Sequence, residues 1–376
     1  MKVVIVGGVA GGATAAARIR RLNEEAEVVV FERSGYISYA NCGLPYYIGD
    51  VITDSEELTL QTPESFFSRF DVDMKVRHEV LSIHPERKTV SVRNLETGEE
   101  FEEHYDKLLL SPGARPVQPE IPGVGLENLF TLRTVEDTMR IKAYIETHQP
   151  KSVVLAGGGF IGLELAENLR ESGMDVTIVQ RAKQLMNPFD PDMASFIHSE
   201  MRRHGVTLAL GHTVEGFVEK EGGIDVLLKG EDPIHADMGI LAIGVAPDAK
   251  LAGEAGIKLG IKGSIVVNER METSIPDIYA VGDAVQIKNA VSGEEDLISL
   301  AGPANKQGRI AADNICGGNS SYSGAQGSSV IKVFDMTAAT TGLNEKRAKK
   351  LGIDTDKVIL SPMSHAGYYP GGKVMT

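Results

Sequence analysis

One pattern occurs twice in this chain of 376 residues: an apolar strand, a glycine-rich turn and the start of a helix rich in small residues. The first copy spans residues 3–12 and the second spans 153–162. Each is followed by a helix-forming segment and then by a β-branched strand, at 27–31 and 175–179. A strand, a crossover helix and a second strand form a βαβ unit with parallel strands. We therefore predict an α/β protein with two Rossmann-like domains.

The glycines of these turns indicate nucleotide binding. Glycine permits a tight turn, close approach of the backbone to a pyrophosphate and close packing of helix on strand. The N-terminus of the following helix offers free N–H groups to phosphates. The second copy has Gly157, Gly159 and Gly162 at the G-x-G-x-x-G positions, whereas the first has Val9 in place of its second glycine. Two such motifs in strand–turn–helix context predict two nucleotide sites.

The residues that end the second strand of each unit suggest which nucleotides bind. Glu32 ends the second strand of the first unit, where a carboxylate can accept hydrogen bonds from ribose hydroxyls. The matching residue of the second unit is Gln180, followed by Arg181 and Lys183. A neutral residue removes repulsion of a 2′-phosphate, which Arg181 could bind, so we predict NADPH there. The alternative is that Arg181 and Lys183 are solvated loop charges.

Two strands that end in Pro/Gly turns, at 108–116 and 239–247, flank the second unit and predict a domain inserted in another. The expected boundaries are 1–112 and 243–322 for the first domain, 113–242 for the inserted domain and 323–376 for a small α+β domain. The sequence stops at Thr376, where a strand is expected to begin. We expect this last domain to be incomplete.

Composition excludes some classes of function. The formal charge of −14 argues against general nucleic-acid binding, which needs a basic face. The apolar run at the N-terminus is too short for a signal core, and no stretch approaches the roughly 20 apolar residues of a membrane span. Two cysteines without paired spacing indicate a reducing compartment, so we expect a cytoplasmic protein. No metal-ligand set is predicted.

Cys42 is the residue that most directly suggests chemistry. It lies in Ser-Tyr-Ala-Asn-Cys-Gly-Leu-Pro at 38–45, and the only other cysteine, Cys316, is interpreted as an inert thiol. A thiol near two dinucleotide sites suggests redox sulfur chemistry. Because no partner cysteine is close in sequence, we expect the partner sulfur to arrive with the substrate. We also predict that Cys42 opens a helix whose N-terminus lowers the pKa of the thiol.

The whole chain resembles the FAD-dependent pyridine nucleotide–disulfide oxidoreductases. The resemblance rests on the two glycine turns, Glu32, the connector Ser111–Pro112–Gly113 and Tyr-Ala-Val-Gly-Asp at 279–283. It implies FAD and NADPH or NADH as cofactors, and the domain order FAD, NAD(P), FAD and dimerisation domain. It also implies a homodimer.

Within this family the single Cys42 implies the branch of NADH oxidases and peroxidases, coenzyme A-disulfide reductases and coenzyme A-dependent persulfide or polysulfide reductases. Oxidases and peroxidases place a histidine at the position of Ala10, so its absence argues against them. We predict reduction of coenzyme A disulfide through a mixed disulfide of Cys42 with coenzyme A (CoA). The alternative is a CoA-dependent persulfide or polysulfide reductase. An NADH oxidase, a reductase of an iron–sulfur protein and a redox-sensing module rank below these two.

The helix after the first turn supports a CoA site. Thr14, Arg18 and Arg21 fall at i, i+4 and i+7 on one helical face, and two guanidiniums suit a ligand with several phosphates. The alternative is a solvated basic face. In CoA reductases, which this chain resembles, this helix binds the coenzyme's phosphates, and Ser38 and Asn41 line the same site. Two contacts found in some of those reductases are replaced here by Phe70 and Asn305.

The resemblance implies further site residues. For FAD these are Gly7, Gly8, Ala10, Gly11, Glu32, Arg33, Asn41, Cys42, Val80, Ser111, Pro112, Gly113, Arg133, Gly282, Asp283, Ala301, Pro303 and Ala304. For NAD(P) they are Gly157, Gly159, Phe160, Ile161, Gly162, Glu164, Gln180, Arg181 and Gly244. Either Tyr368 or Tyr369 is expected to reach the partner subunit's cysteine and protonate a leaving thiolate; Glu164 is equally consistent with a solvent-facing helix residue.

Overall fold

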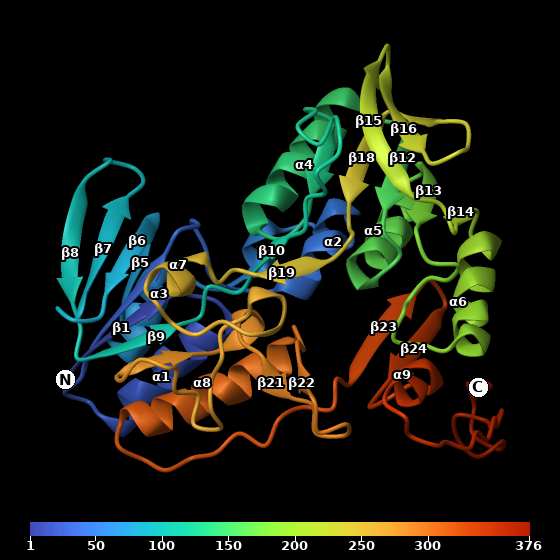
Figure 1. Cartoon of the computed structure of the whole chain (residues 1–376). Helices are drawn as coiled ribbons and strands as arrows, with labels where there is room; N and C mark the ends of the chain where they lie inside the picture. Colours follow the sequence, from blue (N-terminus) through green and yellow to red (C-terminus); the bar gives the residue numbers. More distant parts are fainter.

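The computed structural model describes all residues, 1–376, and contains two five-stranded parallel sheets (Figure 1). The first sheet has the order β20 (Ile278–Ala280), β9 (Lys107–Leu110), β1 (Lys2–Val6), β2 (Glu27–Glu32) and β5 (Asp73–Val76). The second has the order β11 (Leu129–Thr131), β18 (Met238–Leu241), β12 (Ser152–Ala156), β13 (Asp175–Gln180) and β14 (Thr207–Leu210). The predicted α/β fold with two Rossmann-type units is confirmed.

Each parallel sheet has a three-stranded antiparallel sheet in the same unit. In the first unit this is β6 (His78–His84), β7 (Thr89–Asn94) and β8 (Glu100–His104). In the second it is β15 (Val214–Lys220), β16 (Gly223–Leu228) and β17 (Ile234–Ala236). The two units therefore have the same arrangement of sheets. They differ in order along the chain: the outer strand β20 is the last strand of the first sheet in sequence, whereas the matching outer strand β11 is the first strand of the second sheet.

Helices cover the parallel sheets, whose strands are apolar on both faces because they are buried on both faces. α1 (Ala10–Leu22) and α5 (Phe160–Glu171) begin at the two glycine turns, and α8 (Ala301–Ile315) packs along α1. The other helices are α2 (Leu44–Ile48), α3 (Pro63–Phe70), α4 (Val135–His148), α6 (Pro191–Arg203), α7 (Lys250–Glu254) and α9 (Glu345–Lys350). None of the helices has the length and apolar character needed to cross a membrane.

The chain passes between the two units twice at the same place. β10 (Ala114–Pro116) leaves the first unit, β19 (Val245–Pro247) returns to it, and the two strands pair antiparallel. After this return the chain adds β20 to the first sheet, where Ile278 pairs with Leu108. The domain boundaries proposed from the sequence stay a prediction.

The C-terminal part packs against the second unit. β23 (Ser329–Val333) and β24 (Met336–Thr340) form an antiparallel hairpin within 323–376, the range for which the sequence predicted a small α+β domain. This hairpin contacts α5 and α6, and α9 lies beside it (Figure 1). Two short strands, β21 (Ile287–Lys288) and β22 (Glu295–Asp296), precede α8.

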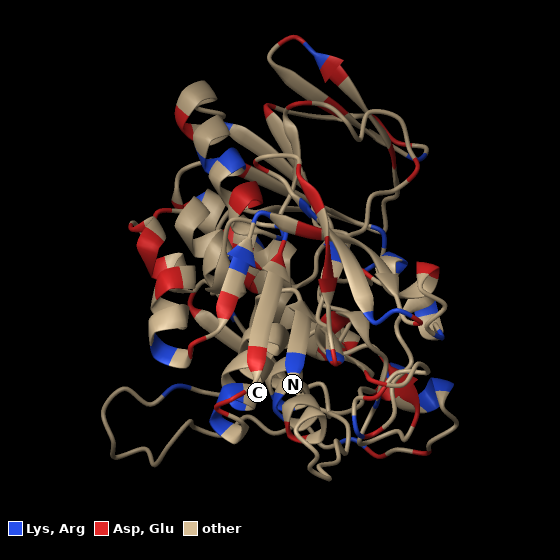
Figure 2. Ribbon diagram, turned by 90° about the vertical axis from the view of Figure 1, so that its left-hand side faces the viewer, with Lys and Arg blue, Asp and Glu red and all other residues tan.

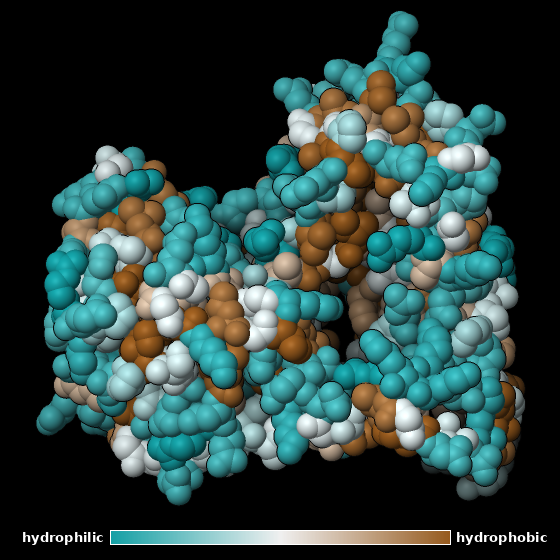
Figure 3. All heavy atoms as spheres, viewed as in Figure 1, coloured by the Kyte–Doolittle hydropathy of each residue, from teal (hydrophilic) through white to brown (hydrophobic).

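Charged and apolar residues are both spread over the molecule. Acidic and basic segments are interspersed on both units (Figure 2). The space-filling view shows a mostly hydrophilic surface with apolar patches, hollowed between the first unit and the second (Figure 3).

Candidate active site

A cavity of about 630 Å³ opens beside the carboxyl ends of the first sheet. It is lined by these predicted FAD residues: Gly7, Glu32, Arg33, Asn41, Val80, Ser111, Pro112, Gly113 and Arg133. The buried Oδ1 atom of Asn41 has no hydrogen-bond partner, and the start of α1 has neither a side-chain cap nor an acidic residue in its first turn. Free N–H groups at a helix start and an unpaired polar atom in the cavity fit a phosphate-bearing nucleotide such as FAD.

Glu32 and Gln180, the last residues of β2 and β13, are held in the same way. Glu32 is buried, and its carboxylate accepts hydrogen bonds from the N–H groups of Gly8 at 2.8 Å and Ser34 at 2.9 Å. Gln180 accepts one from the N–H of Gly158 at 3.2 Å. Both side chains are thus fixed against their glycine turns, so the turn orients the group that would meet a ribose.

The structure explains why the first glycine turn accommodates Val9. Gly7 has a φ of +97°, and a Cβ on Gly12 would lie 1.9 Å from the carbonyl oxygen of Gly7, so both positions need glycine. Val9 has a φ of −100° and the matching Gly159 has −93°, which any residue adopts. Valine is therefore compatible with the turn, and no protein atom lies within 4 Å of a Cβ on Gly159.

Residues far apart in sequence meet beside this cavity. Arg133 Nη2 lies 3.2 Å from Asp283 Oδ2; burial raises the pKa of Asp283, and the Arg133 charge opposes that rise. Gly282 donates its N–H to Gln307 Oε1 at 2.7 Å, a contact between distant residues that no sequence motif indicates. A Cβ on Gly282 would lie 3.7 Å from Ser111 Oγ. The other predicted residues of this site, Gly8, Ala10, Gly11, Ala301, Pro303 and Ala304, lie at or near the packed starts of α1 and α8.

Cys42 lies in a 3₁₀ turn, Asn41–Gly43, between β3 (Ile37–Tyr39) and α2. It is a free thiol and exposed, yet desolvation by the surrounding protein raises its pKa, and the carboxylate of Glu164 raises it further. The predicted lowering of this pKa is wrong. The helix that follows has only five residues, so its dipole is weak, and a carboxylate from α5 faces the thiol.

Glu164 and Glu167 lie one turn apart on α5, which packs against α2. Burial and the neighbouring Glu167 raise the pKa of Glu164 to about 7. Glu167 is 1% exposed; it accepts hydrogen bonds from Lys332 Nζ and from the N–H of Phe334 at 2.7 Å. The C-terminal hairpin is thereby tied to the helix that faces Cys42. The signal in the sequence was a glutamate among the apolar residues of α5.

Tyr46 of α2 belongs to the same cluster and was missed. Its pKa is raised to about 12 by burial first, and then by Glu164, Glu167 and Cys42. Its phenol therefore stays protonated at neutral pH.

The proposed CoA residues of α1 have partners within the chain. Thr14 Oγ1 donates to Asn305 Oδ1 at 2.8 Å, and Arg18 Nε contacts Asp313 Oδ1 at 2.8 Å. The Arg21 guanidinium lies 5.5 Å from the centre of the Phe70 ring, which Arg69 also contacts. Of the two guanidiniums predicted to bind phosphates, one is thus ion-paired, because α8 packs along α1, and the other stacks on Phe70 at the end of α3.

Ser38 lies close to the first glycine turn. It has a φ of +46°, and its N–H donates to the carbonyl of Gly8 at 3.0 Å. The structure therefore brings the predicted CoA residue Ser38 to the first glycine turn, on the strand that leads to Cys42.

The residues proposed for NAD(P) fall into two groups. Gly157, Gly159, Gly162 and Gln180 form the second turn, and Phe160 lines a cavity of about 940 Å³ bounded by residues 294–300 and the C-terminal hairpin. Ile161 packs partly buried against the core of the second unit. Arg181 is exposed, and Gly244, with a φ of +112°, lies in the connector; neither lines this cavity.

Tyr368 and Tyr369 lie away from Cys42 within one chain. Both are exposed, and their ring centres are 5.8 Å apart. They belong to the C-terminal segment, which lies at the lower right of Figure 1, far from α2 near its centre.

Two Rossmann-type units, each with its own glycine turn and linked through the paired strands β10 and β19, define a protein with two dinucleotide sites. A free cysteine follows the strand whose Ser38 contacts the first glycine turn. The family model described as pyridine nucleotide-disulphide oxidoreductase matches residues 1–308. The chain therefore belongs to this family, whose cofactors are FAD and NAD(P)H.

Three named proteins to which this chain is similar include a coenzyme A disulfide reductase and a persulfide reductase. The chain is 37% identical to the coenzyme A disulfide reductase of Staphylococcus aureus over 373 residues, which cover 98% of this chain and 83% of that protein. The crystal structure of reduced Bacillus anthracis CoADR-RHD has a TM-score of 0.96 and 51% identity, covering 99% of this chain and 67% of that one. The NAD-dependent persulfide reductase of A. fulgidus has a TM-score of 0.96 and 35% identity, covering 100% and 70%.

Proposed function

We propose that this protein reduces coenzyme A disulfide with NAD(P)H through Cys42. The observation that carries the proposal is the position of this free, exposed thiol in the 3₁₀ turn between β3 and α2, with no second cysteine in the same segment. A lone redox thiol needs a sulfur from the substrate to complete a disulfide. The similarity to a coenzyme A disulfide reductase supports CoA as the carrier of that sulfur.

Cys42 acts as the nucleophile. Its thiolate attacks one sulfur of CoA–S–S–CoA, so the substrate S–S bond breaks, a Cys42–S–S–CoA bond forms and one CoA thiolate leaves. When bound, FAD supplies two electrons from NAD(P)H to this mixed disulfide. These electrons and one proton regenerate the Cys42 thiolate and release the second CoA thiol.

The chain's own residues place the reacting groups. The glycine turns and Glu32 orient the dinucleotides, and Arg133, which pairs with Asp283, lines the cavity proposed for the flavin. Because the pKa of Cys42 is raised in the chain alone, its thiolate fraction depends on what binds beside it. A positive or hydrogen-bonding ligand group near the sulfur would favour the thiolate.

A second candidate function is the reduction of a CoA persulfide or polysulfide, supported by the similarity to the persulfide reductase of A. fulgidus. It uses the same residues: the Cys42 thiolate attacks the sulfane sulfur, the S–S bond of the substrate breaks, the CoA or shortened polysulfide thiolate leaves, and a Cys42 persulfide forms. Two electrons from NAD(P)H and protons would then release that sulfur as hydrogen sulfide. The order of kcat/KM for CoA disulfide, CoA persulfide and polysulfide decides between the two candidates.

The coenzyme preference and the assembly belong to the proposal. Gln180 and the exposed Arg181 support NADPH over NADH, which the ratio of the two kcat/KM values tests.

A cytoplasmic homodimer completes the site, in which Tyr368 or Tyr369 of one subunit protonates the thiolate that leaves when Cys42 of the other subunit reacts. The C-terminal segment exposes Val358, Leu360, Tyr368 and Val374, and a partner subunit would cover this apolar surface.

The test is steady-state oxidation of NADPH and NADH by the FAD-loaded protein and its Cys42→Ser variant. We expect turnover with CoA disulfide to fall at least about a thousandfold in the variant, because the nucleophile is lost. Flavin content should be unchanged, and Cys316→Ser serves as the matched control with wild-type turnover. Retained turnover in Cys42→Ser would contradict the proposal.

A further inference from the structure

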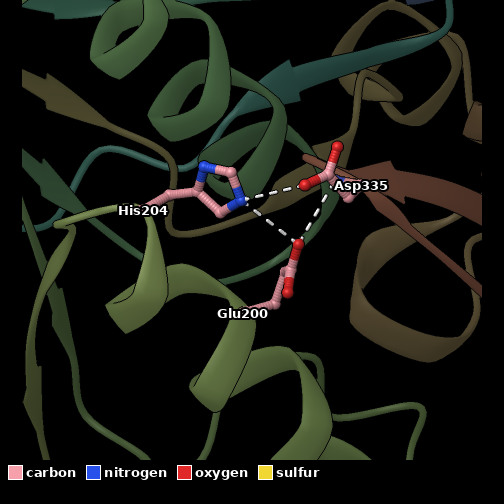
Figure 4. A group of neighbouring side chains, drawn as sticks. All are labelled: Glu200, His204 and Asp335. Atoms are coloured by element: carbon pink, nitrogen blue, oxygen red, sulfur yellow. Dashed lines mark hydrogen bonds and ion pairs between the residues drawn. The ribbon is translucent and has the colours of Figure 1, made fainter.

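Three potential metal ligands converge outside the nucleotide sites. Glu200 and His204 lie one turn apart at the end of α6, and Asp335 lies in the turn between β23 and β24 (Figure 4). Their ligand atoms all lie within 4.8 Å of one another. The sequence predicted no metal site because Asp335 is far from the other two residues in the chain, and only the packing of the hairpin on α6 brings them together.

The two distances from the imidazole nitrogen to the carboxylates suit one small cation. His204 Nε2 lies 3.3 Å from Glu200 Oε1 and 3.5 Å from Asp335 Oδ2. Zinc binds imidazole nitrogen and carboxylate oxygen at about 2.0–2.1 Å, so two ligand atoms of a tetrahedral zinc ion are about 3.3–3.4 Å apart. One imidazole and two carboxylates leave the fourth position for water.

The histidine nitrogen supplies an independent indication. His204 Nε2 is shielded from solvent and has no hydrogen-bond partner, although two carboxylates lie near it. A buried polar atom without a partner points to a missing ligand or ion. The imidazole ring stacks on Phe334, with ring centres 4.0 Å apart and planes 2° apart, so its orientation is fixed toward the carboxylates.

Arg203 is the group that a metal ion would have to displace. Its guanidinium contacts Glu200 Oε1 at 2.7 Å and Asp335 Oδ2 at 3.0 Å, so it now neutralises the same two carboxylates. Its side chain is 60% exposed and can turn into solvent. An arginine and a metal ion that share these oxygens must compete.

We propose that Glu200, His204 and Asp335 form a binding site for a divalent transition-metal ion such as Zn²⁺, which clamps the C-terminal hairpin to α6. The ion exchanges with the Arg203 guanidinium. The site lies outside the proposed redox site, and its test does not depend on turnover.

The experiment is a Zn²⁺ titration of the FAD-loaded, full-length protein against a competing chelator, in a Cys42→Ser background that removes the exposed thiol. We expect one Zn²⁺ per chain and an affinity at least about tenfold weaker in His204→Asn. His235→Asn is the matched control, because His235 pairs with Asp225 at 2.9 Å without a third ligand, and it should bind as the parent does. Arg203→Met should bind Zn²⁺ more tightly, since the competing cation is gone.

Thermal unfolding gives a second readout. Zn²⁺ should raise the unfolding temperature of the parent and not that of His204→Asn, because an ion that binds only the folded chain stabilises it. Equal affinity in His204→Asn and the parent, or weaker binding in Arg203→Met, would overturn the proposal and leave only an ion-pair network. If His204→Asn loses its flavin, Glu200→Gln replaces it, and unchanged affinity there overturns the proposal as well.

Discussion

Cys42 and Glu164 are coupled although they lie on different elements. Burial and then the Glu164 carboxylate raise the pKa of Cys42, and burial and then Glu167 raise the pKa of Glu164 to about 7. No cationic side chain contributes to either shift. Both groups therefore favour their protonated forms in the chain, and a change at one should be measurable at the other.

Glu164→Gln should lower the pKa of Cys42, because it removes the carboxylate that opposes the thiolate. The rate of Cys42 alkylation by iodoacetamide, measured against pH, should then reach its half-maximum at a lower pH than in the wild type. Glu146→Gln, an exposed glutamate on α4, is the control. A profile that stays in place or moves to higher pH would show that the two groups are not coupled.

The same residue makes stability depend on pH. The pKa of Glu164 is raised from 4.5 to about 7 in the folded chain, so the native state holds a proton that the unfolded state loses first. The free energy of unfolding should fall by about 3 kcal/mol as pH rises from about 4.5 to 7. Urea unfolding across this range should show a flatter profile for Glu164→Gln, and parallel profiles would refute the assignment.

At the scale of elements, the glycine turns separate residues needed by the fold from residues needed by the ligand. A Cβ on Gly162 would lie 2.1 Å from the carbonyl oxygen of Gly157, whereas one on Gly159 meets no protein atom. Gly162→Ala should lower the unfolding free energy by about 2 kcal/mol or more. Gly159→Ala should fold normally but raise the KM for NAD(P)H, since the dinucleotide approaches that backbone. Calorimetry and steady-state kinetics check the pair, and equal effects on stability would contradict it.

The elements themselves were largely predictable from the sequence. Buried strands such as 3–6 and 153–156 are continuous apolar runs followed by glycine turns, and this local pattern sets the two parallel sheets. The surroundings of site residues were less predictable. Arg18 pairs with Asp313 because α8 packs on α1, and this contact spans most of the chain. The pKa of Cys42 depends likewise on a carboxylate of the other unit.

At the scale of the whole molecule, the proposed dimer predicts that each active site takes Cys42 from one subunit and a tyrosine, Tyr368 or Tyr369, from the other. Cys42→Ser and the double variant Tyr368→Phe/Tyr369→Phe should each be nearly inactive alone. Coexpressed in equal amounts, they should recover about one quarter of the wild-type activity, because half of the dimers then contain one complete site. Mixed dimers without recovered turnover would show that the tyrosines do not act across subunits.

The antiparallel pair β10–β19 has a consequence for folding. Once the second unit has folded, its two ends lie side by side, with Arg115 opposite Ala246. The first unit must still pair Leu108 with Ile278, residues that are far apart along the chain. Loop-closure entropy grows with the length of flexible chain, so a folded insertion whose ends already meet shortens the effective loop between these strands. Folding of the second unit should thus speed the pairing of β9 with β20 in the first.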